Sequence, residues 1–218
     1  MKRFLATLII LFIATPLFSQ NELVDTELWS GLAVKMKVNK KWKIELEEQI
    51  RFKDSIKTLK SSFTELSARY KINKQFSLKA GYRYSIRYGY RQRNRNRMAL
   101  FLYYNFERDE LPISIQIRSG FQNDIEDYNG QLLSYSRNRI KVNYNPFKDV
   151  ESFFSYESFY RFNSKNEFRT NRFTGGLSWE INKALDLTGF YRVEQEINVD
   201  EPERQHIIGL MLTYSFKY

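Results

Sequence analysis

Alternation between apolar and polar side chains constrains this chain more than any other feature, and it is strictest at the end of the sequence. Six residues, each two positions apart, are all apolar or aromatic: Ile208, Leu210, Leu212, Tyr214, Phe216 and Tyr218. Residues two apart share one face of a β-strand, so the pattern predicts a strand with an apolar face that runs to the last residue. An uncovered strand edge of this kind favours aggregation, so we expect this strand to close a sheet.

The same alternation recurs in ten earlier segments. In the clearest of them, Phe76 to Tyr88, seven alternate residues are apolar or aromatic and the six between them are small or polar. The segments have roughly the length of 9–11 residues that a tilted transmembrane strand needs. They are residues 28–36, 42–52, 62–71, 76–88, 97–107, 113–122, 134–145, 150–162, 168–180 and 185–196. With the terminal segment, the chain has eleven predicted strands.

A short motif separates some of these segments. An apolar residue, Asn, Lys, any residue and an apolar residue recur at residues 38–42, 72–76 and 181–185. Asn tolerates the left-handed backbone that tight hairpins require, so we expect three equivalent turns. Longer polar connections alternate with the short ones, at residues 53–61, 89–96, 123–133, 163–167 and 197–205. This alternation of short and long connections is typical of outer-membrane barrels.

The predicted fold is therefore all-β: an antiparallel transmembrane up-and-down β-barrel of about 10–12 strands, with short periplasmic turns and longer external loops. It forms one domain, residues 20–218. The alternative is a soluble sandwich or lipocalin-like barrel with its apolar face inward. Aromatic residues near the strand ends and dense charges of both signs on the polar face favour the membrane barrel. An even strand number is expected, so either residues 28–36 lie partly outside the wall or a short strand lies within residues 21–27.

The first 19 residues predict export. Lys2 and Arg3 precede an apolar run from Phe4 to Ala14, which is too short to span a membrane, and Pro16 ends it. We interpret residues 1–19 as a cleaved signal peptide; the alternative is an uncleaved anchor. The chain contains no Cys, so no disulfide framework supports it. The expected location is the bacterial outer membrane.

Charged residues of both signs lie on the polar face of the predicted strands, where they would line the lumen. The candidates are Arg51, Arg69, Arg83, Arg118, Arg139, Arg172, Glu45, Glu47, Glu157 and Glu194. One interpretation is a network of paired charges that fills a narrow barrel. The other is a water-filled passage with a positive bias, which would favour anions. The predicted function is structural or a narrow passive pore for small solutes.

A basic segment with aromatic residues follows residue 87. Arg91, Arg93 and Arg95 lie close to Tyr88 and Tyr90. Such a pattern suggests nucleic acid in a cytosolic protein, but predicted export argues against that partner. We expect an external loop that contacts lipopolysaccharide phosphates, since Arg binds phosphate in a bidentate manner. The alternative is a solvated polar loop.

Catalysis is a secondary hypothesis that depends on His206, the one His of the chain. Outer-membrane lipases and deacylases resemble one another in a His-x-Ser pattern on the lipid side of a strand, but residue 208 is Ile. A Ser from another strand, Ser134 or Ser136, would have to replace it, and a Ser without an oriented base is a weak nucleophile. We therefore predict a protein that is not an enzyme. No Cys/His cluster, phosphate loop or nucleotide fingerprint predicts a cofactor or a metal.

Two resemblances extend these predictions. The aromatic residues Tyr214, Phe216 and Tyr218 resemble the C-terminal assembly signal of bacterial outer-membrane proteins, which implies the barrel-assembly machinery as a partner. Residues 28–31, 38–42, 47–52, 70–74 and 81–84 resemble a family of Bacteroidota outer-membrane proteins that is catalogued as a domain of unknown function. The resemblance covers nearly all of the chain after the signal. It implies a barrel and an outer-membrane location, and it supplies no catalytic residues.

Overall fold

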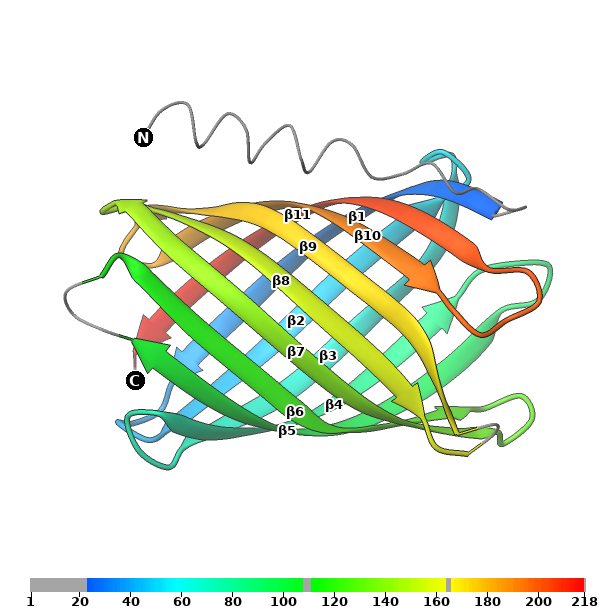
Figure 1. Ribbon diagram of the computed structural model, residues 1–218, viewed down its shortest axis with the longest axis horizontal. Coiled ribbons are helices and arrows are strands. Elements are labelled where there is room, and N and C mark those ends of the chain that lie inside the picture. Colours follow the sequence, from blue (N-terminus) through cyan, green and yellow to red (C-terminus); the bar gives the residue numbers. More distant parts are fainter. Residues whose placement is uncertain (1–22, 108–110, 164–165, 218) are drawn as a thin grey trace.

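The computed structural model describes residues 23–107, 111–163 and 166–217, and all regular secondary structure in these ranges is β-strand (Figure 1). The strands are β1 (Leu23–Lys37), β2 (Trp42–Lys53), β3 (Thr58–Lys71), β4 (Phe76–Arg87), β5 (Arg93–Glu107), β6 (Ile113–Glu126), β7 (Leu132–Phe147), β8 (Val150–Arg161), β9 (Glu167–Asn182), β10 (Leu185–Glu196) and β11 (Glu203–Lys217). No helix in these ranges has the length and apolar character needed to span a membrane.

The eleven strands form one closed barrel. Each strand pairs antiparallel with its neighbours in the chain, and β1 and β11 close the barrel as a parallel pair along their whole length (Figure 1). The prediction of an all-β barrel of about 10–12 strands is confirmed, and the number is eleven. The expectation of an even number is wrong, because one parallel ladder also satisfies the backbone groups of both edges. Residues 23–27 are part of β1 and form no separate strand, and residues 28–36 lie in the wall; residues 21 and 22 fall outside the described residues.

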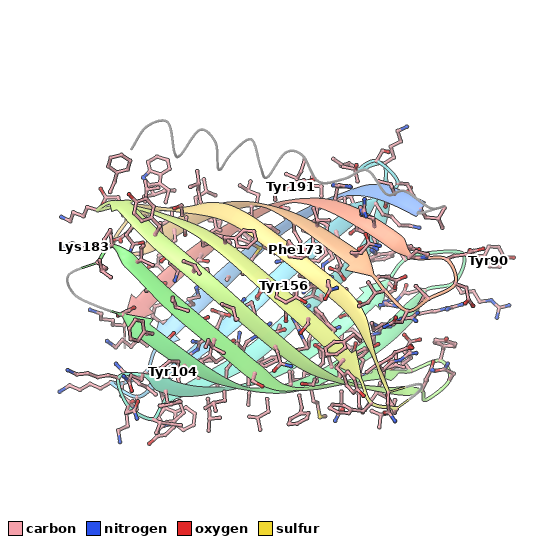
Figure 2. The ribbon with its side chains drawn as sticks, in the orientation of Figure 1. Tyr90, Tyr104, Tyr156, Phe173, Lys183 and Tyr191 are labelled. Carbon is pink, nitrogen blue, oxygen red and sulfur yellow. The ribbon has the colours of Figure 1, made fainter. Side chains whose placement is uncertain are left out.

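The barrel has two rims, which are named here by their connections. The loop rim holds the connections of β2–β3, β4–β5, β6–β7, β8–β9 and β10–β11 and the start of β1; the turn rim holds the others and the end of β11. In Figure 2, Tyr90 of the loop rim and Lys183 of the turn rim lie at opposite ends of the barrel.

Strands reach further toward the loop rim than predicted. β3 begins at Thr58, β5 at Arg93, and β6 continues to Glu126. Much of the predicted long connections is therefore strand, and the expected contrast between short and long connections is small. Polar residues continue the ladder because backbone pairing does not require an apolar face.

The three Asn motifs are turns, but for a different reason from the predicted one. Asn39 Oδ1 accepts hydrogen bonds from the amides of Lys41 (2.8 Å) and Trp42 (2.9 Å). Asn73 accepts two equivalent bonds in its own turn, and Asn182 accepts one. The Asn side chain thus replaces a backbone acceptor, as in an Asx-turn. The non-glycine residues with positive φ in the described ranges lie at the loop rim: Asp54, Ser55, Ile56, Asn166 and Asn198.

The polarity of the barrel is inverted relative to a soluble protein. Among the described residues, thirteen buried side chains are polar or charged and seven are hydrophobic. The outward face is apolar, with Leu66, Leu100 and Leu177 each more than half exposed. Aromatic side chains such as Tyr104 and Phe173 project from the outer surface (Figure 2). This arrangement excludes the lipocalin-like alternative, in which apolar residues fill the interior.

Candidate functional site

The predicted lumen charges converge on the inside of the barrel. Eight of the ten line one large cavity of about 840 Å³: Arg51, Arg83, Arg118, Arg139, Arg172, Glu47, Glu157 and Glu194. The other two lie against this lining. Glu45 accepts a hydrogen bond from Lys79 (3.1 Å), and the guanidinium of Arg69 lies 4.0 Å from the ring centroid of Tyr103.

The large cavity is strongly basic. Its lining contains fifteen Lys and Arg side chains and seven Asp and Glu side chains. It extends from the loop rim, where Lys53 and Glu203 lie, to Lys79 and Tyr103, which lie in the halves of β4 and β5 nearer the turn rim. The bases remain in excess even with the acids outside the lining that pair with them, Glu27, Glu45, Glu126 and Glu167, so the interior of this cavity carries a positive field.

Aromatic side chains in the lumen were not predicted, because the alternation assigned aromatic residues to the outer face. Trp29, Phe63, Phe101 and Phe159 are buried inside the barrel. Each lies on the polar face of its segment. This position in the alternation is the one signal in the sequence that could have predicted an aromatic ring inside the barrel.

Inward glycines make room for some of these rings. A Cβ added to Gly120 would approach the Phe101 ring to 2.7 Å, and one added to Gly209 would overlap the ring of Phe190. The glycine on the neighbouring strand therefore leaves the space that each ring occupies. Guanidinium groups then stack on the exposed ring faces, where cation–π attraction holds them.

One such stack, which we name the Trp29 stack, consists of Phe190, Arg192, Trp29, Arg51, Phe63 and Arg83. The Cζ atom of Arg51 lies 3.7 Å from the ring centroid of Trp29, and that of Arg192 lies 4.9 Å from it. The indole is fixed from behind, because its Nε1 donates to the buried carboxylate of Glu27 at 2.8 Å. Trp29 is thus a fixed platform that both guanidiniums contact.

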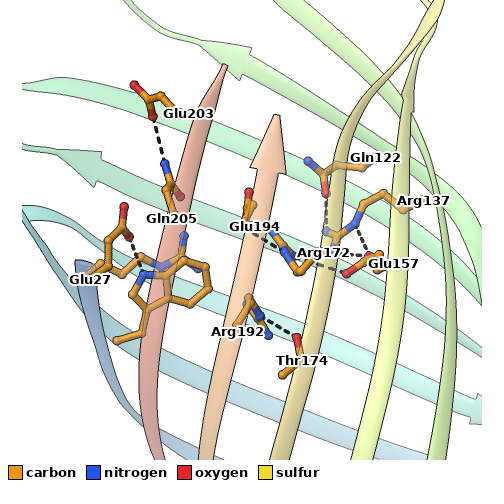
Figure 3. A network of polar contacts seen from close by, with 12 residues as sticks. Glu27, Gln122, Arg137, Glu157, Arg172, Thr174, Arg192, Glu194, Glu203 and Gln205 are labelled. Carbon is orange, nitrogen blue, oxygen red and sulfur yellow. Dashed lines mark hydrogen bonds and ion pairs between the residues drawn. The ribbon is translucent and has the colours of Figure 1, made fainter. Parts of the chain in front are cut away.

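A second stack, the Glu157 stack, consists of Arg118, Phe101, Arg137, Phe159 and Arg172. All three of its arginines bind the carboxylate of Glu157, Arg137 through Nε at 2.8 Å and Arg172 through Nη1 at 3.3 Å (Figure 3). Glu157 is 4% exposed, so this is a buried charge cluster with an acid at its centre.

The Trp29 stack has fewer acidic partners. Arg83 pairs with Glu65. By contrast, Arg51 donates Nε to the amide oxygen of Gln49 (2.7 Å), and Arg192 donates Nε to the Thr174 hydroxyl (2.9 Å; Figure 3). Within the described ranges neither Arg51 nor Arg192 forms a salt bridge.

A smaller cavity of about 350 Å³ lies at the turn rim, lined by polar residues that include Asn105 and Gln116. Arg139, which lines the large cavity, donates Nη2 to Gln116 Oε1 at 2.8 Å. Gln116 in turn donates to Asn105 at 2.8 Å. The Arg139–Gln116 contact therefore lies at the boundary between the two cavities.

The three arginines predicted to meet lipopolysaccharide have different surroundings. Arg95 lines the large cavity and pairs with Asp124 and Glu126. Arg93 lies 4.5 Å from the ring centroid of Tyr128. Arg91 is exposed in the connection between β4 and β5. Sequence reasoning missed the two acids, because it assigned residues 123–133 to a loop.

Asp25, at the loop rim before the apolar part of β1, binds the β2–β3 connection. Its carboxylate accepts the amides of Asp54 (3.0 Å) and Ser55 (3.1 Å). Burial tends to raise the pKa of Asp25, but these amide hydrogen bonds outweigh it and hold the pKa below its ordinary value of 3.8. The same connection has three consecutive residues at positive φ, including the β-branched Ile56 (φ 70°), so the carboxylate stabilises a strained backbone.

His206 faces outward, as the alternation predicts. Its Nδ1 is hydrogen-bonded to the hydroxyl of Tyr191 on β10, and its register neighbour on β1 is Thr26. The proposed serines, Ser134 and Ser136, lie on β7, which does not adjoin β11. The hypothesis that one of them completes a catalytic pair with His206 is wrong, because three strands separate β7 from β11.

Other predicted features lie at the ends of the chain. Tyr214 and Phe216 are exposed side chains of β11, whereas Tyr218 and the predicted signal peptide fall outside the described residues. Within the described ranges, no group of three His, Cys, Asp or Glu residues could hold a metal ion.

Fold and lumen together define a closed eleven-stranded β-barrel with a basic, aromatic-lined cavity. The chain belongs to DUF2490, a family described as a protein of unknown function, which matches residues 26–205. The predicted membership of a family of unknown function is confirmed. No curated protein matches the chain significantly. A similar solved structure, described as NanC porin in a rhombohedral crystal form, is 13% identical with a TM-score of 0.49, covering 78% of this chain and 86% of that one.

Proposed function

We propose that this chain is an integral outer-membrane β-barrel whose lumen is a narrow passive route for small solutes and favours anions. The observation that carries this proposal is the inverted polarity of the barrel. Its outer face is apolar, while its interior holds a cavity with fifteen basic and seven acidic side chains.

A bilayer explains the outer face better than water does. Large apolar side chains cover the outside, and exposed apolar surface of this extent marks contact with another apolar phase. Aromatic pairs near the turn rim, such as Trp42–Tyr70 with centroids 4.9 Å apart, suit the membrane interface. The closed ladder leaves no strand edge unpaired, which hydrocarbon requires.

The lumen supports selection by charge and by size. Excess positive charge in a low-dielectric wall attracts anions and repels cations. The Arg139–Gln116 contact between the two cavities limits the route to small solutes. This proposal combines the two interpretations of the polar face, since paired charges narrow a passage that retains a positive bias.

Conductance across a planar bilayer tests the proposal. Insertion of the refolded protein should give discrete steps, with a reversal potential displaced toward the chloride equilibrium potential in a KCl gradient. Arg139→Ala should raise the step size because it removes the boundary between the cavities. The matched control is Lys53→Ala, which removes one positive charge at the loop rim without widening the boundary.

Two outcomes would contradict this function. One is the absence of steps in repeated insertions; the other is a protein that stays soluble without detergent and shows the same gel mobility before and after boiling. The first result would remove the passage and leave the barrel fold intact, and the second would remove the membrane barrel.

We further propose two partners. Exposed Arg91 suits a lipopolysaccharide phosphate, and the outward rings of Tyr214 and Phe216 suit recognition by the barrel-assembly machinery. Arg91→Gln should weaken binding of lipopolysaccharide to the refolded barrel in detergent, and Phe216→Ala should slow assembly in cells. Unchanged binding or unchanged assembly would remove the corresponding partner.

A further inference from the structure

Arg51 and Arg192 line the large cavity, and neither has a salt-bridge partner among the described residues. Each donates only Nε to a neutral side chain, so the two terminal nitrogens of each guanidinium have no protein partner within the described residues. The nearest acid along β10, Glu194, is bound by Arg172 Nη2 at 2.7 Å. Four N–H-bearing nitrogens on one platform are therefore available to a ligand.

We propose that Arg51 and Arg192, which both stack on Trp29, form a binding subsite for the carboxylate or phosphate group of a small solute. This inference rests on the proposed function, because the solute would enter through the lumen. Both ligand groups present two or more oxygens in the geometry that a guanidinium binds with paired hydrogen bonds.

Stacking on Trp29 preorganises Arg51 and Arg192 for binding. Flexible cationic side chains lose conformational entropy when they bind a ligand, but both guanidiniums already lie against the indole. Glu27 fixes the indole through Nε1, and Lys60 compensates the buried charge of Glu27. The site is thus organised before any anion arrives.

The Glu157 stack shows why the subsite lies on one wall only. Arg118, Arg137 and Arg172 use their donors on the Glu157 carboxylate, which occupies the position that an external anion would take. In the Trp29 stack neither Arg51 nor Arg192 forms a salt bridge within the described residues, and the nearby carboxylate of Glu194 is bound by Arg172. An anion from solution would supply the partner that these two guanidiniums lack.

Trp29 itself can report binding. The chain has three Trp residues, so the Trp42→Phe/Trp179→Phe background leaves Trp29 as the one indole. Refolded protein in detergent, at constant ionic strength, would be titrated separately with inorganic phosphate and with succinate. We expect a saturable change in Trp29 fluorescence with at least one of them, and the probe that saturates identifies the phosphate or the carboxylate class.

Charge variants separate a subsite from a general field. In that background, Arg51→Gln and Arg192→Gln should each weaken binding by about tenfold, the loss expected for a charge-assisted hydrogen bond. Lys53→Gln is the control, since it removes the same charge from the rim of the same cavity and should change affinity less than about twofold, as for exposed charges. Heat-modifiable gel mobility verifies that each variant is folded, and Arg192→Gln still decides the question if Arg51→Gln misfolds.

The titration does not depend on conductance, so the two proposals can fail separately. Saturable binding without conductance would remove the passive route and leave the subsite. Chloride-favouring conductance with a linear, non-saturating fluorescence response to both probes would overturn the subsite and leave the route. Equal weakening by Arg51→Gln and Lys53→Gln would also overturn it.

Discussion

The Trp29 stack and the Glu157 stack both consist of arginine and aromatic side chains and lie on two walls of one lumen. They differ in that only the Glu157 stack has one carboxylate that all of its arginines share. In both, guanidiniums lie against aromatic rings at 3.6–5.5 Å from the centroids. In the Glu157 stack one buried acid joins three arginines, whereas Arg51 and Arg192 bind only neutral oxygens. Stacking therefore positions the cations, and the presence or absence of an acid decides whether they hold the wall together or remain available.

Removal of Glu157 should have the largest effect on stability, because it leaves the arginines of its stack without their shared carboxylate. In Glu157→Gln, three buried guanidiniums lose their common carboxylate, and breaking a buried charge cluster costs about 3–5 kcal/mol of unfolding free energy. Urea titration of the refolded barrel, followed by gel mobility, measures the loss. Glu151→Gln is the control, since its pair with Lys141 is more exposed and should contribute less than about 1 kcal/mol. Equal losses would show that Glu157 is not a structural centre.

The Trp29 stack should break when its ring support is removed. Gly209→Ala places a Cβ where the Phe190 ring lies, so the ring and the Arg192 guanidinium above it have to move. Overpacking of this kind costs roughly 1–3 kcal/mol of unfolding free energy. Gly189→Ala, with no atom within 4 Å of the added Cβ, should be nearly neutral in the same urea titration. If Gly209→Ala is neutral as well, the position of the Phe190 ring does not depend on the absence of a side chain at residue 209.

An added acid should make the two stacks alike. Thr174 accepts a hydrogen bond from Arg192, so Thr174→Glu would give this arginine the carboxylate it lacks. We expect the chloride-to-potassium permeability ratio to fall about threefold more than in Thr170→Glu, which corresponds to an ion pair of about 0.7 kcal/mol. Thr170 lines the same cavity on the same strand without contacting Arg192, so it controls for net charge. Equal falls in the permeability ratio would mean that only the net charge of the lumen determines its ion selectivity.

The contrast between the stacks also shows what the sequence could predict. Period-2 alternation identified eleven strands and assigned Arg51, Glu157 and the other lumen charges to one face, because side-chain direction follows directly from position in a strand. It did not identify the parallel β1–β11 closure. That pairing depends on which edges meet in space, and the assumption of an even strand number supplied the wrong constraint.

The aromatic half of both stacks was missed for another reason. Phe101 lies inside because Gly120 on the neighbouring strand leaves space for its ring, and that neighbour is set by register between strands. Trp29 is held by Glu27, two residues earlier on its own strand. Asp124 and Glu126 were missed because polar strand ends resemble loops when apolar alternation is the criterion. Alternation therefore predicts the direction of a side chain, while its partners require the register.

The smallest expected effect concerns the rim on the β1 side, where Asp25 shares a strand with Trp29. The pKa of Asp25 is lowered in the folded protein, so its carboxylate stabilises the β2–β3 connection at neutral pH, and that stabilisation is lost as pH falls through the folded value. In Asp25→Asn, the amides of Asp54 and Ser55 should exchange with deuterium about twofold faster at neutral pH, because exposed hydrogen bonds contribute only about 0.5 kcal/mol.

Lowering the pH tests the cause of that difference. The ratio of exchange rates between Asp25→Asn and the natural chain should approach one once the pH is well below 3.8, since both side chains are then neutral. Asp127→Asn is the control: its carboxylate accepts from Asn96 at a different connection, so it should leave the two amides unaffected. A ratio that stays constant from neutral to acidic pH would show that side-chain shape, rather than the charge of Asp25, holds the strained connection.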